Sequence, residues 1–141
     1  MSSAAPRSEA ERIEAFLASG AFAVVGASTD RTKYGNKVLR CYQQHGRKVY
    51  PVNPKAPEVE GQRAYPSLAA LPEPVPAISV ITPPAATERV VHEAHAAGVK
   101  HVWMQPGAES DEAIQAAEAL GMNVIAGGPC LLVVMGYREQ D

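Results

Sequence analysis

Five short apolar runs alternate along this chain with segments whose apolar residues recur at helical spacing. The runs cover residues 22–27, 48–53, 77–82, 102–105 and 124–126. Runs this short and this uniformly apolar are typical of parallel strands buried on both faces. Their alternation with helices predicts an α/β fold. We expect a single Rossmann-like, doubly wound parallel sheet of about five strands, with helices on both faces, in one domain spanning residues 1–141.

Helix boundary signals accompany this pattern. Ser8 and Glu11 match a capping box at the start of a first helix, which Gly20 should end. Further helices are expected over residues 35–45, 84–97 and 111–120, with a short terminal element at 131–137. The proline-rich residues 54–76 are predicted to form a loop that holds at most one helical turn, at 67–71.

Composition narrows the choice of partners. The formal charge is −2, whereas non-specific nucleic-acid binding needs a basic surface, so no nucleic-acid partner is expected. No apolar run reaches the roughly 18 residues of a membrane span. The polar start of the chain lacks the apolar core of a signal peptide, and we therefore expect a cytoplasmic protein without a membrane partner. Cys41 and Cys130 are too few for a disulfide framework or a four-cysteine zinc site.

The turn after the first apolar run has the composition of a phosphate-binding loop. Gly26, Ala27 and Ser28 are small enough to bring backbone N–H groups close to an anion, and a helix start follows. The dinucleotide fingerprint G-x-G-x-x-G is absent. Asn53 and Lys55 stand near the position where an NAD site would place an acidic residue. The loop indicates a nucleotide other than NAD, although the glycines could instead serve packing alone.

Right-handed crossovers should bring every strand-to-helix loop to the carboxyl edge of the sheet. Each of these loops contains Gly or Pro, and cations gather in the first two at Arg31, Lys33, Lys37 and Lys55. Cations are not what a helix N-terminus prefers, which favours an anion between them. A solvated surface is the alternative. The edge suits a long ligand that carries several phosphates.

Five motifs in register resemble the CoA-binding domain family, the small stand-alone relatives of the N-terminal domain of the succinyl-CoA synthetase α subunit. The resemblance covers about residues 9–131. The motifs are Val25-Gly26-Ala27-Ser28, Lys33-Tyr34-Gly35, Val52-Asn53-Pro54-Lys55, Ile81-Thr82-Pro83-Pro84 and Trp103-Met104-Gln105-Pro106-Gly107-Ala108.

The resemblance implies coenzyme A as the ligand and assigns contacts to these loops. The residues implied are Gly26, Ala27, Ser28, Arg31, Lys33 and Tyr34 near the pyrophosphate, Val52, Asn53, Pro54 and Lys55 at the adenosine end, Thr82 and Pro83 beside the nucleotide, and Met104, Gln105, Pro106 and Gly107 along the pantetheine arm. Lys55 would face the phosphate on the ribose. A cation in place of the acidic residue independently favours a phosphorylated ribose.

One departure from the family stands near Cys130. Members often carry Asp-Arg-Cys there, whereas this chain has Gly128-Pro129-Cys130. Cys130 is therefore expected either as a partly buried structural residue or as a thiol that can form a mixed disulfide with CoA. Cys41 is expected in the core of the second helix. His92 and His95 lie three apart without a third ligand, so no metal site is predicted.

No catalytic constellation accompanies these loops, because the histidines are predicted away from the carboxyl edge. The leading hypothesis is a protein that binds CoA or a short acyl-CoA. Two alternatives stay open: the CoA-binding subunit of a split acyl-CoA ligase, and an NADP-binding regulator that uses Lys55 for a 2′-phosphate. A protein partner is compatible with the sequence and leaves no mark in it.

Overall fold

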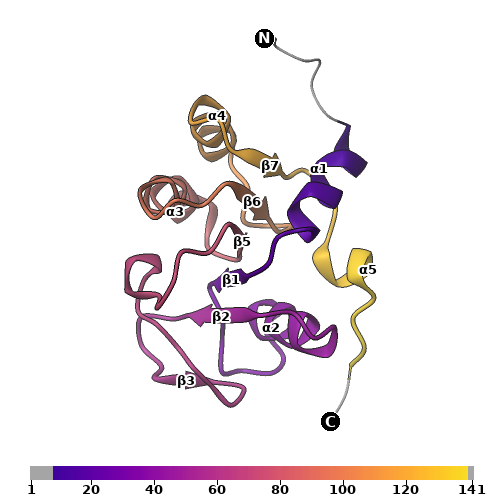
Figure 1. Ribbon diagram of the computed structural model, residues 1–141, viewed down its shortest axis with the longest axis vertical. Coiled ribbons are helices and arrows are strands. Elements are labelled where there is room, and N and C mark those ends of the chain that lie inside the picture. Colours follow the sequence, from indigo (N-terminus) through magenta and orange to yellow (C-terminus); the bar gives the residue numbers. More distant parts are fainter. Residues whose placement is uncertain (1–7, 140–141) are drawn as a thin grey trace.

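A computed structural model of the chain describes residues 8–139, and the expectation for the polar start of the chain concerns residues 1–7, which lie outside this range. The central sheet has five parallel strands (Figure 1). In spatial order they are β2 (Val49–Val52), β1 (Phe22–Val25), β5 (Ala77–Val80), β6 (His101–Met104) and β7 (Asn123–Ile125). The predicted fold class is confirmed, with strand ends within about two residues of those expected.

Helices cover both faces of this sheet (Figure 1). One layer contains α1 (Glu9–Leu17), α2 (Tyr34–Gln44) and the short α5 (Leu131–Met135). The opposite layer contains α3 (Pro84–Ala96), α4 (Asp111–Ala119) and the 3-10 turn η1 (Leu68–Ala70). Because successive strand residues face opposite sides, β1 sends Phe22 and Val24 into the first layer and Ala23 and Val25 into the second.

Side-chain caps fix the starts of two helices, including the capping box predicted at Ser8 and Glu11. At α1 the Ser8 hydroxyl accepts the Glu11 N–H at 3.2 Å, and the Glu11 carboxylate accepts the Ser8 N–H at 2.8 Å. At α4 the Ser110 hydroxyl accepts the Ala113 N–H at 3.1 Å. Each cap provides a partner for an N–H group that the helix itself leaves unpaired.

The prediction that residues 54–76 hold nothing beyond one helical turn is wrong. That turn is present as η1, but an antiparallel hairpin precedes it, formed by β3 (Glu58–Val59) and β4 (Gln62–Arg63). Both turn residues, Glu60 and Gly61, have positive φ angles of 49° and 77°. Val59 is 1% exposed and packs into the layer that contains α2, which ties the hairpin to the core.

The order in which the chain adds strands to the sheet reverses between β1 and β5. From β1 the chain moves outward to β2, and it later returns to place β5 on the other side of β1. The loops that follow β1 and β5 therefore lead away from each other at the carboxyl edge. In open α/β sheets this is the position where ligands bind.

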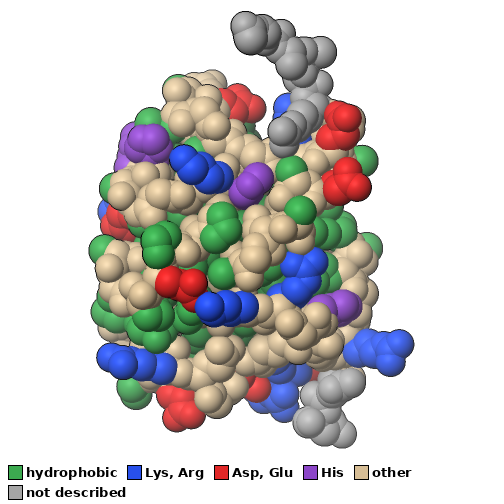
Figure 2. Space-filling model, viewed as in Figure 1, with side chains coloured by type: hydrophobic (Ala, Val, Ile, Leu, Met, Phe, Trp, Pro, Cys, Tyr) green, Lys and Arg blue, Asp and Glu red, His purple; other side chains and the backbone are tan. Residues whose placement is uncertain are grey.

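No helix among residues 8–139 is both long and apolar enough to cross a membrane. On the face shown in Figure 2, Lys and Arg side chains are interspersed with carboxylates and histidines. This face therefore carries no basic patch of the kind that binds nucleic acid.

Candidate functional site

The loop after β1, residues 26–33, here termed the phosphate loop, turns sharply between two backbone segments. Gly26 has a φ of 100°, and a Cβ built on it would lie 1.9 Å from the Ile81 carbonyl oxygen. A Cβ on Gly35 would lie 2.0 Å from the Gly26 carbonyl oxygen. Both glycines are thus required by close backbone packing, whatever the loop binds.

Short side chains form hydrogen bonds within this loop. The Asp30 carboxylate accepts the Thr32 hydroxyl at 2.6 Å and the Thr32 N–H at 2.9 Å, while the Ser28 hydroxyl accepts the Asp30 N–H at 3.0 Å. The hydrogen bonds from Thr32 hold the pKa of the Asp30 carboxyl below its usual value. These hydrogen bonds hold the loop in a defined turn.

Several backbone donors of the loop are left without partners. Within residues 8–139, the N–H groups of Ala27, Ser28 and Thr29 donate to no other residue. Lys33 is the N-cap of α2 and supplies no side-chain cap, although Ser, Thr, Asn or Asp is usual there. Unsatisfied N–H groups beside an uncapped helix start are what an anion such as a phosphate requires.

Asn53 joins the ends of β1 and β2. Its Nδ2 donates to the Ala27 carbonyl oxygen at 2.8 Å, and its Oδ1 accepts the N–H groups of Lys55 at 2.7 Å and Ala56 at 3.0 Å. A carboxylate at position 53 could not donate to Ala27, so the amide has a structural cause. The turn that follows presents Lys55 as an exposed side chain.

A cavity of about 310 Å³ lies at the carboxyl edge, between the loops that follow β5 and β6 and the start of α2. Its walls are Tyr34, Ile81, Thr82, Pro83, Pro106, Gly107 and Ala108. The Thr82 hydroxyl lies 2.8 Å from that of Thr87, and the latter donates to the Ala108 carbonyl oxygen at 2.6 Å. Buried Thr87 thereby fixes the two loops against each other.

Gln105 is next to the wall residue Pro106 in the chain, and its side chain is fully buried. Its Oε1 accepts the Tyr34 hydroxyl at 3.2 Å and the Leu131 N–H at 3.0 Å, and its Nε2 donates to the Ser79 hydroxyl at 3.3 Å. The side chain thus holds the wall residue Tyr34 rather than lining the cavity itself. The Tyr34 hydroxyl also forms a short contact with the Cys130 thiol, and burial raises the Tyr34 pKa above its usual value.

The structure brings most of the sequence-predicted site residues to one edge, but it does not expose all of them. Ala27, Val52 and Met104 are 3%, 4% and 0% exposed, so only their backbone groups could reach a ligand. Partly or fully exposed are Gly26, Ser28, Arg31, Lys33, Tyr34, Asn53, Pro54, Lys55, Thr82, Pro83, Pro106 and Gly107.

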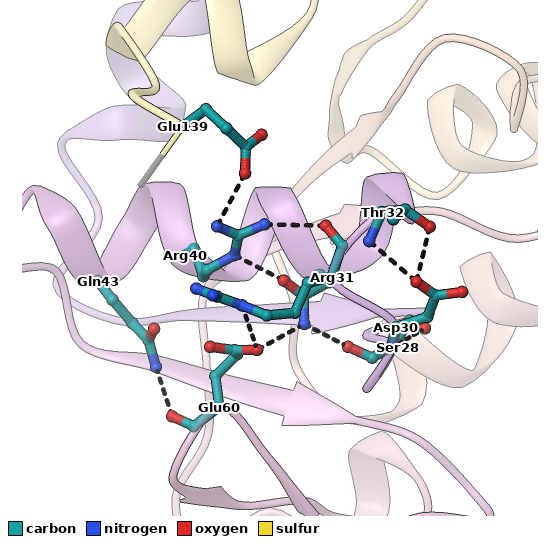
Figure 3. Close-up of polar contacts among 9 residues, drawn as sticks. Ser28, Asp30, Arg31, Thr32, Arg40, Gln43, Glu60 and Glu139 are labelled. Atoms are coloured by element: carbon teal, nitrogen blue, oxygen red, sulfur yellow. Dashed lines mark hydrogen bonds and ion pairs between the residues drawn. The ribbon is translucent and has the colours of Figure 1, made fainter. Parts of the chain in front are cut away.

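Two of the four cations have partners that the sequence did not reveal. Arg31 Nε lies 3.3 Å from a Glu60 carboxylate oxygen at the hairpin tip (Figure 3), and Lys37 Nζ lies 3.5 Å from Glu139. Lys33 and Lys55 make no hydrogen bond or ion pair through their ammonium groups in the described part of the chain. The two lysines without such a partner lie at the N-cap of α2 and in the turn after β2.

Cys41 and the four histidines lie outside the phosphate loop and the cavity wall. Cys41 is buried in α2, as predicted, and burial raises its pKa to about 11. His92 and His95 lie in α3, His45 ends α2 and His101 begins β6. Within residues 8–139 no cluster of three or more His, Cys, Asp or Glu side chains could hold a metal ion.

The sheet order, the phosphate loop and the cavity at the carboxyl edge define a Rossmann-like α/β domain. A family model described as "CoA binding domain" matches residues 20–136, a range that includes all five strand-to-helix loops. The chain belongs to this CoA-binding domain family.

Its relatives include both small and large proteins. The uncharacterized protein YneT of Bacillus subtilis is 30% identical over 118 residues, which are 84% of this chain and 87% of that protein. A solved hypothetical protein from Pyrococcus horikoshii is 30% identical with a TM-score of 0.83, over 94% of this chain and 95% of that one.

The α subunit of acetate–CoA ligase (ADP-forming) II of Pyrococcus furiosus is 32% identical over 80% of this chain. The match covers 27% of that subunit, so this chain spans about a quarter of its length.

Proposed function

We propose that this protein binds coenzyme A or a short acyl-CoA at the carboxyl edge of the sheet. The observation that carries the proposal is the family match over residues 20–136, because this range includes every loop of that edge. The phosphate loop receives the pyrophosphate on its unpaired N–H groups. The pantetheine arm follows the cavity between the β5 and β6 loops.

The adenosine end lies over residues 52–55 in this proposal. Lys55 is exposed, extends from the turn that Asn53 stabilises, and carries a charge without a partner among residues 8–139. It pairs with the 3′-phosphate of the CoA ribose. The 2′-phosphate of NADP could also pair with Lys55. However, the phosphate loop lacks the G-x-G-x-x-G sequence of dinucleotide sites, and the Asn53 amide already donates its hydrogen bond to the Ala27 carbonyl oxygen.

Isothermal titration calorimetry with CoA, dephospho-CoA, NAD and NADP tests this proposal. We expect CoA to bind most tightly, dephospho-CoA more weakly, and neither dinucleotide to compete. Native mass spectrometry of the freshly purified protein gives an independent result, since a retained ligand adds its own mass. Tighter binding of NADP than of CoA refutes the proposal.

A split acyl-CoA ligase is the second candidate, and the similarity to a ligase α subunit supports it. In that case the catalytic machinery belongs to another polypeptide. Purified alone, the protein should then release no ADP from ATP, acetate and CoA. Co-purification of a second chain that restores this activity would establish the ligase assignment.

A further inference from the structure

The hairpin that the sequence did not reveal reaches the phosphate loop through one side chain. Glu60 stands at the hairpin tip, and its Oε2 accepts Asn36 Nδ2 at 2.9 Å and lies 3.3 Å from Arg31 Nε (Figure 3). These contacts join residues 29 and 24 positions apart in the chain. They make the β3–β4 turn part of the wall of the phosphate loop.

The carboxylate is held in place independently of Arg31. Asn36 is fully buried, and its Nδ2 also donates to the Ser28 carbonyl oxygen at 2.8 Å. Its Oδ1 accepts Arg40 Nε at 2.6 Å, which fixes the orientation of the amide. The Arg40 guanidinium donates to the Arg31 carbonyl oxygen at 2.9 Å (Figure 3). Glu60 therefore binds Arg31 from a rigid support.

The side chain of Arg31 is suited to contact a ligand. It is 47% exposed, whereas that of Glu60 is only 19% exposed. Glu60 contacts the guanidinium at Nε, and the terminal nitrogens of Arg31 have no hydrogen-bond or ion-pair partner within residues 8–139. A guanidinium held at Nε presents its terminal N–H groups in a fixed direction, a geometry that suits phosphate oxygens.

The backbone at Glu60 indicates that the carboxylate has a role beyond the turn. Its φ of 49° is uncommon for residues other than Gly, Asn and Asp, which are the ordinary choices for a two-residue hairpin turn. A residue kept in an uncommon backbone conformation beside a binding loop points to function. Glu58, on the same hairpin, is exposed and makes no ion pair in the described part of the chain.

We propose that Glu60 is a positioning residue that orients Arg31 toward the phosphate groups of the ligand. The proposal rests on CoA binding at the carboxyl edge. Arg31 then binds phosphate well because Glu60 holds its terminal nitrogens in one direction, toward the ligand. A carboxylate acting only through its charge would instead repel the same anion.

The test compares Glu60→Gln with Glu58→Gln by calorimetry, using CoA and inorganic pyrophosphate as ligands. Glu60→Gln keeps the size of the side chain and an oxygen that can accept the Asn36 hydrogen bond, but it removes the charge that pairs with Arg31. We expect its Kd for both ligands to rise about two- to fivefold, the range that the loss of one half-exposed ion pair can produce. Glu58→Gln removes an equal charge from the same hairpin and should leave both Kd values unchanged.

A double-mutant cycle with Arg31→Met separates positioning from a general structural effect. Once Arg31 is gone, Glu60→Gln should cause no further loss of affinity. An equal loss in the Arg31→Met background overturns the proposal, as does equal or tighter binding by Glu60→Gln alone.

The two ligands also separate this inference from the proposed function. If the unmodified protein binds pyrophosphate but not CoA, CoA binding is refuted and the pyrophosphate series decides the role of Glu60. If it binds neither ligand, both proposals are refuted.

Discussion

Gly35→Ala should destabilise this protein, although glycine-to-alanine changes inside helices usually stabilise. Gly35 is the second residue of α2, where helix propensity alone favours alanine by about 1 kcal/mol. The new Cβ, however, would lie 2.0 Å from the Gly26 carbonyl oxygen, and ordinary contact begins near 3.4 Å. The backbone must therefore separate by about 1.4 Å (3.4 Å minus 2.0 Å).

The neighbour cannot yield easily, because the atom in contact is a backbone carbonyl and Gly26 itself packs on Ile81. Overpacking of a rigid contact costs about 1–3 kcal/mol. After the gain in propensity, we expect a net loss of up to roughly 2 kcal/mol. In a domain of this length that corresponds to a fall in Tm of as much as about 8 °C.

Gly20→Ala is the matched control. A Cβ added at Gly20 would meet no atom within 4 Å, and the residue has no positive φ, so alanine should raise stability by about 0.4–1 kcal/mol through the unfolded state. Urea unfolding followed by circular dichroism measures both variants. If Gly35→Ala is as stable as Gly20→Ala, α2 does not approach the phosphate loop as closely as described.

Three further predictions concern single side chains. Lys55→Ala should weaken CoA about tenfold and leave dephospho-CoA unchanged in calorimetry, because only CoA carries the ribose phosphate. Equal weakening of both ligands would remove Lys55 from the phosphate contact. Asn53→Asp should lower the free energy of unfolding by about 2 kcal/mol in urea titrations, since a carboxylate then faces the Ala27 carbonyl oxygen. The pKa of about 11 at buried Cys41 leaves roughly a thousandth of it as thiolate at pH 8. Iodoacetamide should therefore label Cys130 first, as peptide mapping would show, and Cys41 only after unfolding or well above pH 8.

The helices and parallel strands could be predicted because their signals are local. The Ser8–Glu11 capping box and the apolar runs need no knowledge of distant residues. The hairpin could not be predicted in this way. Its strands are two residues long, largely polar, and joined by a turn whose first residue is Glu60 rather than Asn, Asp or Gly.

For the candidate site, loop composition indicated the edge but not the direction of each side chain. Gln105 was expected along the ligand, and the structure buries its side chain, with Tyr34 71 positions away as a partner. Arg31 was recognised as a cation at the loop, yet its pairing with Glu60 depends on a hairpin that only tertiary packing stabilises. Contacts over such separations leave no local pattern in a single sequence.

The single tryptophan of this chain gives the candidate site an optical reporter of its own. Trp103 is fully buried in β6, and its indole N–H donates at 3.0 Å to the carbonyl oxygen of Pro129, next to Cys130. Cys130 in turn contacts Tyr34 in the cavity wall. A ligand that moves Tyr34 would disturb this short path, so the emission of Trp103 can follow occupancy without any added label.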